Sequence, residues 1–251
     1  GAFGLSTGLI YPPGSFTQTE EIAAIARPVG DRGGIYFSHI RGEADTLLTA
    51  ISEAIRIGRE SGAAVQISHF KVAGRKNWDT VERALALIDE ARTEGLDVTS
   101  DLYPYLAGST ALSALLPQWA HEGGKEAVAK RLADPGVREK MTVSMQSEGF
   151  AKDMEWDRVL ISFAPGKAEY QGRYVAELAR DKGKSPHEWL FDALLETGLR
   201  AAMITFMMSE ENRLRELRHP AMMIGTDGMG YAVSSSMSEG LPHPRNDTRS
   251  E

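Results

Sequence analysis

The sequence has no cysteine among its 251 residues. Disulfide bonds and thiolate metal ligands are therefore excluded within this chain, and we expect a reducing, cytoplasmic location. The chain also lacks runs of basic residues, and its 28 Lys and Arg are outnumbered by 35 Asp and Glu. A nucleic-acid-binding surface needs clustered basic residues, so we expect no nucleic-acid partner.

Long apolar runs are absent as well. A membrane-spanning helix needs about 20 apolar residues in succession, and no signal peptide is visible, so we expect no membrane partner. The hydrophobic fraction of 42% and the charged fraction of 25% are typical of a soluble globular protein. The chain begins without methionine, inside an apolar pattern, and stops without a closing element, so we expect an excerpt of a longer protein.

A repeat of strand and helix patterns fills the first hundred residues. Helical periodicity recurs in three segments, and β-branched or aromatic runs separate them. We expect strands at 3–11, 34–40, 64–70 and 96–105, and helices at 17–29, 44–62 and 77–95. Pro28 is expected to close the first helix, Gly62 the second and Gly95 the third. Such alternation is typical of a parallel sheet whose strands are joined by helices.

This rhythm breaks after Tyr105. Mostly helical patterns follow, and we expect a largely helical insertion at 120–220, with a strand at 157–163 inside it. A last buried strand, 221–226, then ends at Asp227.

Two histidines stand at corresponding points of the repeat. His39 and His69 each follow a serine at the end of an expected strand, thirty residues apart. Alternation places His39 on the face of Phe37 and His69 on the face of Ile67. Ligands of parallel α/β folds bind beyond the carboxyl ends of the strands, where two imidazoles could share a zinc ion. The alternative is that each is an ordinary hydrogen-bonded histidine.

Two carboxylates compete for the role of proton carrier. A metal-dependent hydrolase needs a base that takes a proton from water and returns it to the leaving group. Asp101 lies one repeat after His69, and Asp227 ends an apolar strand among small residues. The residues alone leave both open, with Asp101 also suited to bracing the exit of its strand.

Several polar residues are expected near the same end of the sheet. Arg41 and Lys71 follow the two histidines by two residues each, and either could bind a substrate carboxylate. The alternative for each is an ordinary salt bridge, with Glu43 as the expected partner of one of them. The remaining candidates are Tyr11, Tyr103, Tyr105 and Ser109.

Taken in order, five motifs resemble the N-acyl-D-amino-acid deacylases (D-aminoacylases) of the amidohydrolase superfamily. They are GLSTGLIYPPG, FSHIRGE, ISHFK, DLYPYLAGST and IGTDG. The resemblance implies an α/β fold, a partial (β/α)8 TIM barrel of about strands 4–8 with a helical insertion between the last two strands. Residues 1–251 would then form a single incomplete barrel domain, with 120–220 inserted in it.

The resemblance also implies roles for individual residues. His39 and His69 would be zinc ligands and Asp227 the catalytic acid and base, which decides against Asp101. Tyr11, Lys71, Tyr103 and Ser109 would contact the substrate. The His-x-His pair of this family and its bridging ligand are absent, so the chain resembles a middle fragment, with the other ligands of one or two zinc ions expected upstream.

The activity implied is zinc-dependent hydrolysis of the amide bond of a small-molecule N-acyl-D-amino acid, releasing a carboxylate and a D-amino acid. Two alternatives remain. One is another amidohydrolase, of the dihydroorotase or hydantoinase kind, that opens cyclic amides. The other is a non-catalytic α/β binding domain in which both histidines are structural.

Overall fold

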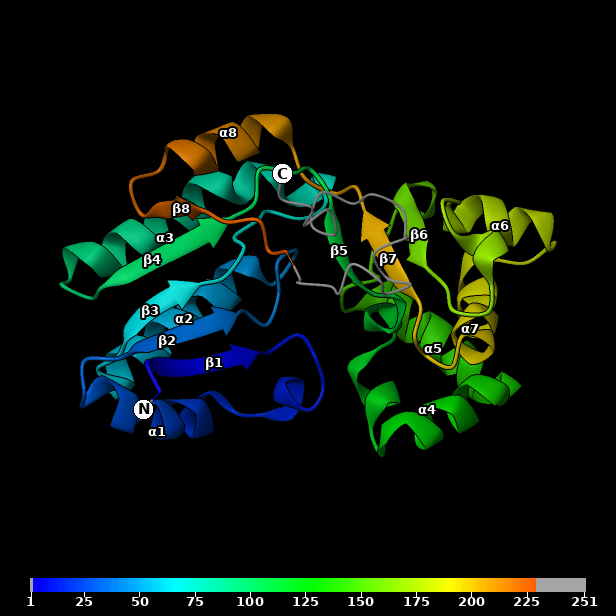
Figure 1. Ribbon diagram of the computed structural model, residues 1–251, viewed down its shortest axis with the longest axis horizontal. Coiled ribbons are helices and arrows are strands. Elements are labelled where there is room, and N and C mark those ends of the chain that lie inside the picture. The colour runs from blue at the N-terminus through cyan, green and yellow to red at the C-terminus, as the bar shows by residue number, and fades with distance from the viewer. Residues whose placement is uncertain (1, 229–251) are drawn as a thin grey trace, which may run out of the picture. The chain divides into compact units, whose positions relative to one another are not determined.

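A computed structural model describes residues 2–228 (Figure 1). These residues form two compact units, one of residues 2–106 and 208–227 and the other of residues 107–207. Among the described residues, every helix is too short or too polar to cross a lipid bilayer.

The first unit is built on a parallel sheet of five described strands in the order β1-β2-β3-β4-β8. The strands are β1 (Gly4–Gly8), β2 (Ile35–His39), β3 (Ala64–Ile67), β4 (Val98–Leu102) and β8 (Met222–Ile224). The helices are α1 (Thr19–Gly30), α2 (Leu47–Ser61), α3 (Val81–Thr93) and α8 (Glu210–Arg218), with short 3-10 turns at Gly14–Phe16 and Arg75–Thr80. The parallel strand–helix repeat predicted for the first hundred residues is confirmed.

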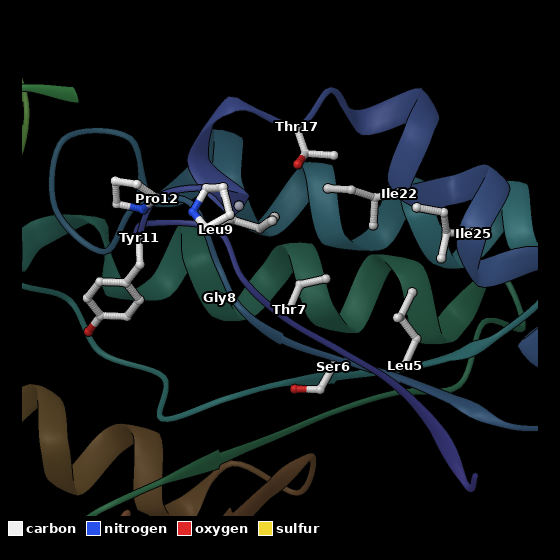
Figure 2. Close-up of a pocket in the computed structure, with 12 residues that line it drawn as sticks. Leu5, Ser6, Thr7, Gly8, Leu9, Tyr11, Pro12, Thr17, Ile22 and Ile25 are labelled. Carbon is white, nitrogen blue, oxygen red and sulfur yellow. The ribbon is translucent and has the colours of Figure 1, made fainter. Parts of the chain in front are cut away.

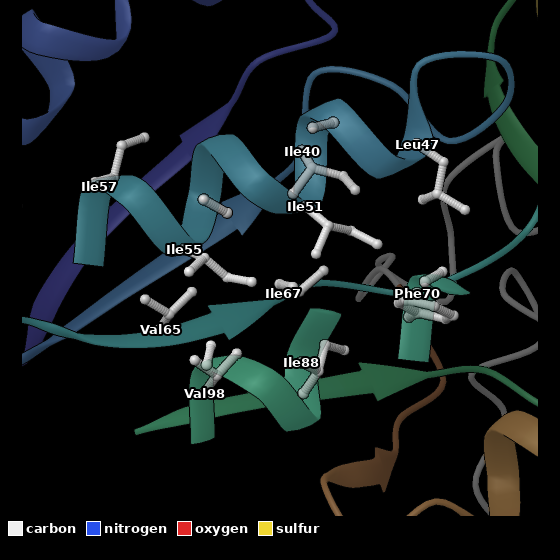
Figure 3. Packing of buried hydrophobic residues seen from close by; sticks show 14 of the residues in the cluster. Ile40, Leu47, Ile51, Ile55, Ile57, Val65, Ile67, Phe70, Ile88 and Val98 are labelled. Atoms are coloured by element: carbon white, nitrogen blue, oxygen red, sulfur yellow. The ribbon is translucent and has the colours of Figure 1, made fainter. Parts of the chain in front are cut away.

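All four helices lie in one layer. Each packs against the next, α1 on α2, α2 on α3 and α3 on α8, and Figure 1 shows them side by side along the sheet. The core lies between this layer and the sheet, where Ile51, Ile67 and Ile88 are fully buried (Figure 3). The other face of the sheet stays partly open, because Phe37 is 38% and Met223 49% exposed.

The second unit has a different architecture. Its described strands form an antiparallel sheet in the order β5-β7-β6, and helices from the intervening chain pack around a second core that contains Trp189 and Phe191. The strands are β5 (Gly108–Ala111), β6 (Val159–Phe163) and β7 (Ala202–Thr205). The helices are α4 (Gly124–Ala133), α5 (Pro135–Ser147), α6 (Val175–Asp181) and α7 (Pro186–Glu196), with further 3-10 turns between them.

The boundaries of this unit differ from the insertion expected at 120–220. The unit runs from 107 to 207 because β5 and β7, at its two ends, pair with each other. Strands of four residues carry too little periodicity to be recognised, and their partners lie far away in the sequence. The helical segments in between match the prediction more closely.

Two further predictions are wrong, the end of the first helix and the burial of the last strand. Helix α1 continues through Pro28 to Gly30, although proline has no N–H to donate to the carbonyl four residues before it. The last strand is not buried, since Ile224 is 74% exposed. Among the described strands, β8 pairs only with β4. Gly62, by contrast, ends α2 in a left-handed conformation, as predicted.

Candidate metal centre

The structure brings the rings of His39 and His69 together at the carboxyl ends of β2 and β3. Their centroids are 4.2 Å apart, and the rings meet edge to face at 75°. His39 is the last residue of β2, whereas His69 lies two residues beyond the end of β3. The predicted meeting of the two imidazoles is therefore confirmed as geometry, and their role as ligands stays a prediction.

The prediction placed His69 on the same face of the sheet as Ile67, and the structure does not agree with the orientation that this implies. Ile67 pairs in register with Ser38, so it belongs to the helix-covered face and not to the face of Phe37 and His39. Strict alternation would therefore turn His69 toward the helices. The chain leaves the strand after Ile67, and His69 has a left-handed backbone with φ 36°, which redirects its ring.

Glu43 completes the cluster and is the residue that the sequence interpretation missed as a candidate ligand. Its Oε1 lies 3.0 Å from His69 Nδ1 and 3.9 Å from His39 Nε2. It also forms an ion pair with Lys71, whose side chain is 4% exposed. Burial favours the protonated form of Glu43, but the positive charge of Lys71, together with His39 and His69 in their protonated forms, outweighs burial and holds the pKa of Glu43 well below the usual range. The carboxylate is therefore ionised.

These three side chains fit a zinc ion. One donor atom from each of His39, Glu43 and His69 can be chosen so that all lie within 4.8 Å of one another. Zinc bonds of about 2.0–2.2 Å at tetrahedral angles place neighbouring ligand atoms about 3.3–3.6 Å apart, and His2Glu is a known zinc-hydrolase ligand set. The observed 3.0 and 3.9 Å lie on either side of that spacing.

Glu43 suits either of two roles at such a site. It can bind a metal ion directly through its carboxylate. Alternatively, it can accept a hydrogen bond from Nδ1 of His69, which orients the ring and leaves Nε2 for the metal.

Three of the predicted substrate-contacting residues surround the cluster. The ring of Tyr11 lies 5.0 Å from that of His39, and the ring of Tyr103 lies 6.5 Å from that of His69. Lys71 Nζ is 2.8 Å from His69 Nδ1 and 5.4 Å from the centroid of Tyr103. Ser109 lies in β5, in the second unit. Lys71, and not Arg41, is thus the salt-bridge partner of Glu43.

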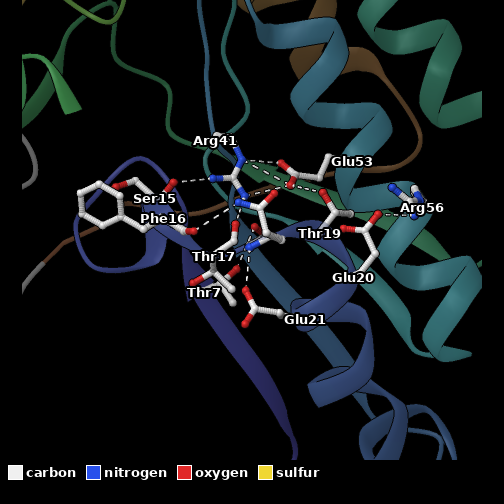
Figure 4. A network of polar contacts seen from close by, with 12 residues as sticks. Thr7, Ser15, Phe16, Thr17, Thr19, Glu20, Glu21, Arg41, Glu53 and Arg56 are labelled. Carbon is white, nitrogen blue, oxygen red and sulfur yellow. Dashed lines mark hydrogen bonds and ion pairs between the residues drawn. The ribbon is translucent and has the colours of Figure 1, made fainter. Parts of the chain in front are cut away.

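Arg41 holds the backbone beside the site. Its guanidinium binds the carboxylate of Glu53 on α2, with the shortest contact at 2.9 Å, and donates to the carbonyls of Ser15 and Thr17 (Figure 4). Thr19 Oγ1 donates to the same carboxylate. Arg41 therefore ties the loop after β1 to α2, and the salt-bridge interpretation of this residue is confirmed.

Replacing Arg41 by Met is expected to lower the free energy of unfolding by about 2–3 kcal/mol, because it leaves the carboxylate of Glu53 without its cation and two carbonyls without a donor. Arg56→Met is the matched control, since Arg56 also binds two glutamates from α2 and α1 but is half exposed. Its loss is expected to stay below about 1 kcal/mol. Urea denaturation of both variants measures the difference, and equal losses would contradict this account of Arg41.

The two candidate aspartates have different environments. Asp101 lies in β4, and both of its carboxylate oxygens accept hydrogen bonds, from the backbone N–H of His69 and from Gln66. Asp227 follows β8 by three residues, is exposed and has a left-handed backbone with φ 51°. Just before it, the N–H of Gly225 donates to the carbonyl of Leu102, which places the exit of β8 beside the end of β4.

A buried ion pair on α8, between Arg213 and Glu216, lies next to residues of the site. Arg213 is 3% exposed, donates to the carbonyl of Phe70 and lies 5.6 Å from the centroid of Tyr103. Burial raises the pKa of its partner Glu216 to about 7, because Arg213 and Lys71 only partly offset it. Sequence reasoning missed both, since α8 carries charges on every side and resembles a solvent-exposed helix.

Comparison with known proteins bears on this site. No family model matches the sequence. The chain is 33% identical to a D-aminoacylase of Alcaligenes xylosoxydans xylosoxydans over 245 residues, or 98% of its length. It also superposes on a crystal structure of D-aminoacylase with a TM-score of 0.66 and 35% identity over 91% of the chain, and 39% of that protein. The chain is a homologue of the D-aminoacylases.

A second solved structure extends this relationship. An N-acyl-D-glutamate deacylase from Bordetella bronchiseptica, crystallised with zinc and a phosphonate inhibitor, has a TM-score of 0.69 and 31% identity, covering 91% of this chain and 40% of its own. The chain spans about 40% of the length of the curated D-aminoacylase that it matches.

Proposed function

We propose that this chain provides part of the active site of a zinc-dependent N-acyl-D-amino-acid deacylase, an enzyme that hydrolyses the amide bond and releases a carboxylate and a D-amino acid. The observation that carries the proposal is the cluster of His39, Glu43 and His69 at the ends of adjacent strands. Its occurrence in a homologue of the D-aminoacylases supports the assignment of the reaction.

His39 and His69, with Glu43 as ligand or orienting group, would hold the zinc ion. The chemistry that such an ion supplies is Lewis acidity, which lowers the pKa of water toward about 7 and polarises a carbonyl group. Asp227 would take the proton from the attacking water and deliver it to the departing amine. Further zinc ligands are expected from residues upstream of this chain.

The polar residues around the cluster suit binding of the substrate. Lys71 carries a buried positive charge beside His69, which suits recognition of the α-carboxylate of an amino acid. Tyr11 and Tyr103 flank the two imidazoles and would contact the acyl group and the amide. Ser109, in β5 of the second unit, stays a predicted substrate contact.

We further infer that the parallel sheet is part of a (β/α)8 barrel. The described helices of this unit all cover one face of the sheet, and side chains such as Phe37 lie on the other face. This arrangement suits a barrel wall whose interior is filled by side chains. Beside β1 and α1 lies a pocket of about 440 Å³ with apolar walls that include Leu5, Ile22 and Ile25 (Figure 2). A preceding strand–helix unit would pack against this surface.

Turnover of enantiomers tests the proposed function. We expect the zinc-loaded enzyme containing this chain to hydrolyse N-acetyl-D-amino acids, N-acetyl-D-glutamate included, and to leave the L-enantiomers and cyclic amides unchanged. The measurement is release of free amine from matched D and L substrates. Hydrolysis of a hydantoin or of dihydroorotate in place of the linear amides would instead favour a cyclic amide hydrolase.

A further inference from the structure

The backbone of His69 has an unusual conformation for its position. It lies just beyond a strand but has φ 36°, a left-handed value that few residues other than glycine adopt. Such a conformation persists where the surroundings fix it, and it is found most often at functional sites. Because this turn directs the ring toward His39 and Glu43, whatever fixes the turn also fixes the proposed ligand geometry.

Asp101 holds this turn through three hydrogen bonds. Its Oδ1 accepts from the N–H of His69 at 2.8 Å, and its backbone carbonyl accepts from the N–H of Phe70 at 2.7 Å. Its Oδ2 accepts from Nε2 of Gln66 at 2.7 Å. The residue therefore binds the N–H groups of His69 and Phe70 at the turn and the side chain of Gln66 in β3.

Gln66 in turn fixes the carboxylate of Asp101. Gln66 is 3% exposed, and its amide oxygen accepts a hydrogen bond from Thr99, so the amide nitrogen faces Asp101. Both carboxylate oxygens of Asp101 are thus committed to donors of the protein. A carboxylate engaged in this way suits holding a backbone better than exchanging protons with a substrate.

We propose that Asp101 is a positioning residue, which fixes the left-handed turn at His69 and thereby orients the imidazole for zinc. The inference rests on the proposed metal centre, and it assigns Asp101 a task different from that of the catalytic aspartate. Residues that orient metal ligands typically change metal affinity by about 10- to 100-fold when they are removed.

Zinc affinity of single variants tests the proposal. Asp101→Ala removes both side-chain acceptors and is expected to weaken zinc binding roughly 10- to 100-fold. Asp101→Asn keeps an acceptor for the N–H of His69 but no longer accepts from Gln66, so it is expected to recover most of the affinity, to within about three- to tenfold of wild type. The measurement is competition for zinc with a chromophoric chelator, combined with the absorption spectrum of the cobalt-substituted protein, which reports ligand geometry.

Ser100→Ala is the matched control. Ser100 precedes Asp101 in β4, is fully buried, and donates to the carbonyl of Ile67 at 2.7 Å. Its loss removes a buried hydrogen bond between the same two strands on the helix-covered face. We expect a lower melting temperature with unchanged zinc affinity and an unchanged cobalt spectrum.

The outcomes separate this proposal from the proposed function. Wild-type protein that binds no zinc overturns both. If wild-type protein binds zinc and Asp101→Ala behaves like Ser100→Ala, the positioning role alone is overturned. The same holds if Asp101→Asn binds zinc as weakly as Asp101→Ala. If Asp101→Ala does not fold, Gln66→Met provides the test. This change removes the donor to Oδ2 of Asp101 and is expected to weaken zinc binding roughly three- to tenfold. Unchanged zinc affinity in Gln66→Met counts against the positioning role.

Discussion

Replacing His69 by Ala is expected to reduce bound zinc from about one equivalent to less than a tenth and to remove hydrolysis of N-acyl-D-amino acids. Catalytic zinc sites use about three protein ligands, so loss of one imidazole leaves too few donors to retain the ion. The ring of His69 also contacts both other members of the cluster, at 4.2 Å from the ring of His39 and 3.0 Å from Glu43. Metal analysis after gel filtration, together with turnover, measures the effect.

His219→Ala is the control for this prediction. Its imidazole lies at the carboxyl end of α8, before β8 begins, and contacts Asp89 at 3.3 Å. That position is at the opposite end of the strands from His69, so zinc content and turnover are expected to stay at the wild-type level. If His69→Ala keeps its zinc, the metal-centre hypothesis is wrong and both histidines are structural.

Replacing Asp227 by Asn is expected to lower kcat by about 10²- to 10⁴-fold, the range that general acid–base catalysis contributes. Asparagine has the same shape but cannot accept the proton of the attacking water or return one to the departing amine. Zinc content and KM are expected to change little, because Asp227 is exposed beyond β8 and is assigned no role in holding the substrate. Steady-state kinetics with metal analysis separate these quantities.

Comparison with a second aspartate sharpens this test. Asp97 lies just before β4 begins, at the end of the strand opposite Asp101, and Asp97→Asn is expected to leave kcat unchanged. Asp101→Asn is expected to lose far less than Asp227→Asn, because its carboxylate oxygens already serve the protein. The reverse order of losses would make Asp101 the proton carrier and would contradict the role inferred for Asp227.

How far the sequence predicted the fold depended on the range of the interactions involved. The strand–helix repeat was predictable because side-chain periodicity within α2 and α3 reflects burial on one side of each helix. The antiparallel sheet of the second unit was not. Its pairing joins β5 to β7, nearly the whole unit apart in the sequence, and no local pattern specifies that partner.

In the candidate site too, the features set by local pattern were predictable and those set by contacts between loops were not. The two imidazoles were predictable because equal phase in a repeat brings strand ends to one edge of a sheet. Glu43 was foreseen as a salt-bridge partner but not as a candidate ligand. Its position follows from the loop after β2, which folds back so that the carboxylate meets Lys71 of the next loop.

The sequence by itself determined a parallel strand–helix repeat, with two histidines at adjacent strand ends and two aspartates near the same edge, because these features follow from local periodicity. Only the tertiary structure decided that His69 turns back toward His39, that Glu43 joins them, that Arg41 serves the scaffold and that Asp101 holds the turn. Each of these depends on hydrogen bonds or ion pairs between segments distant in the chain, and such contacts exist only once the strands are in register.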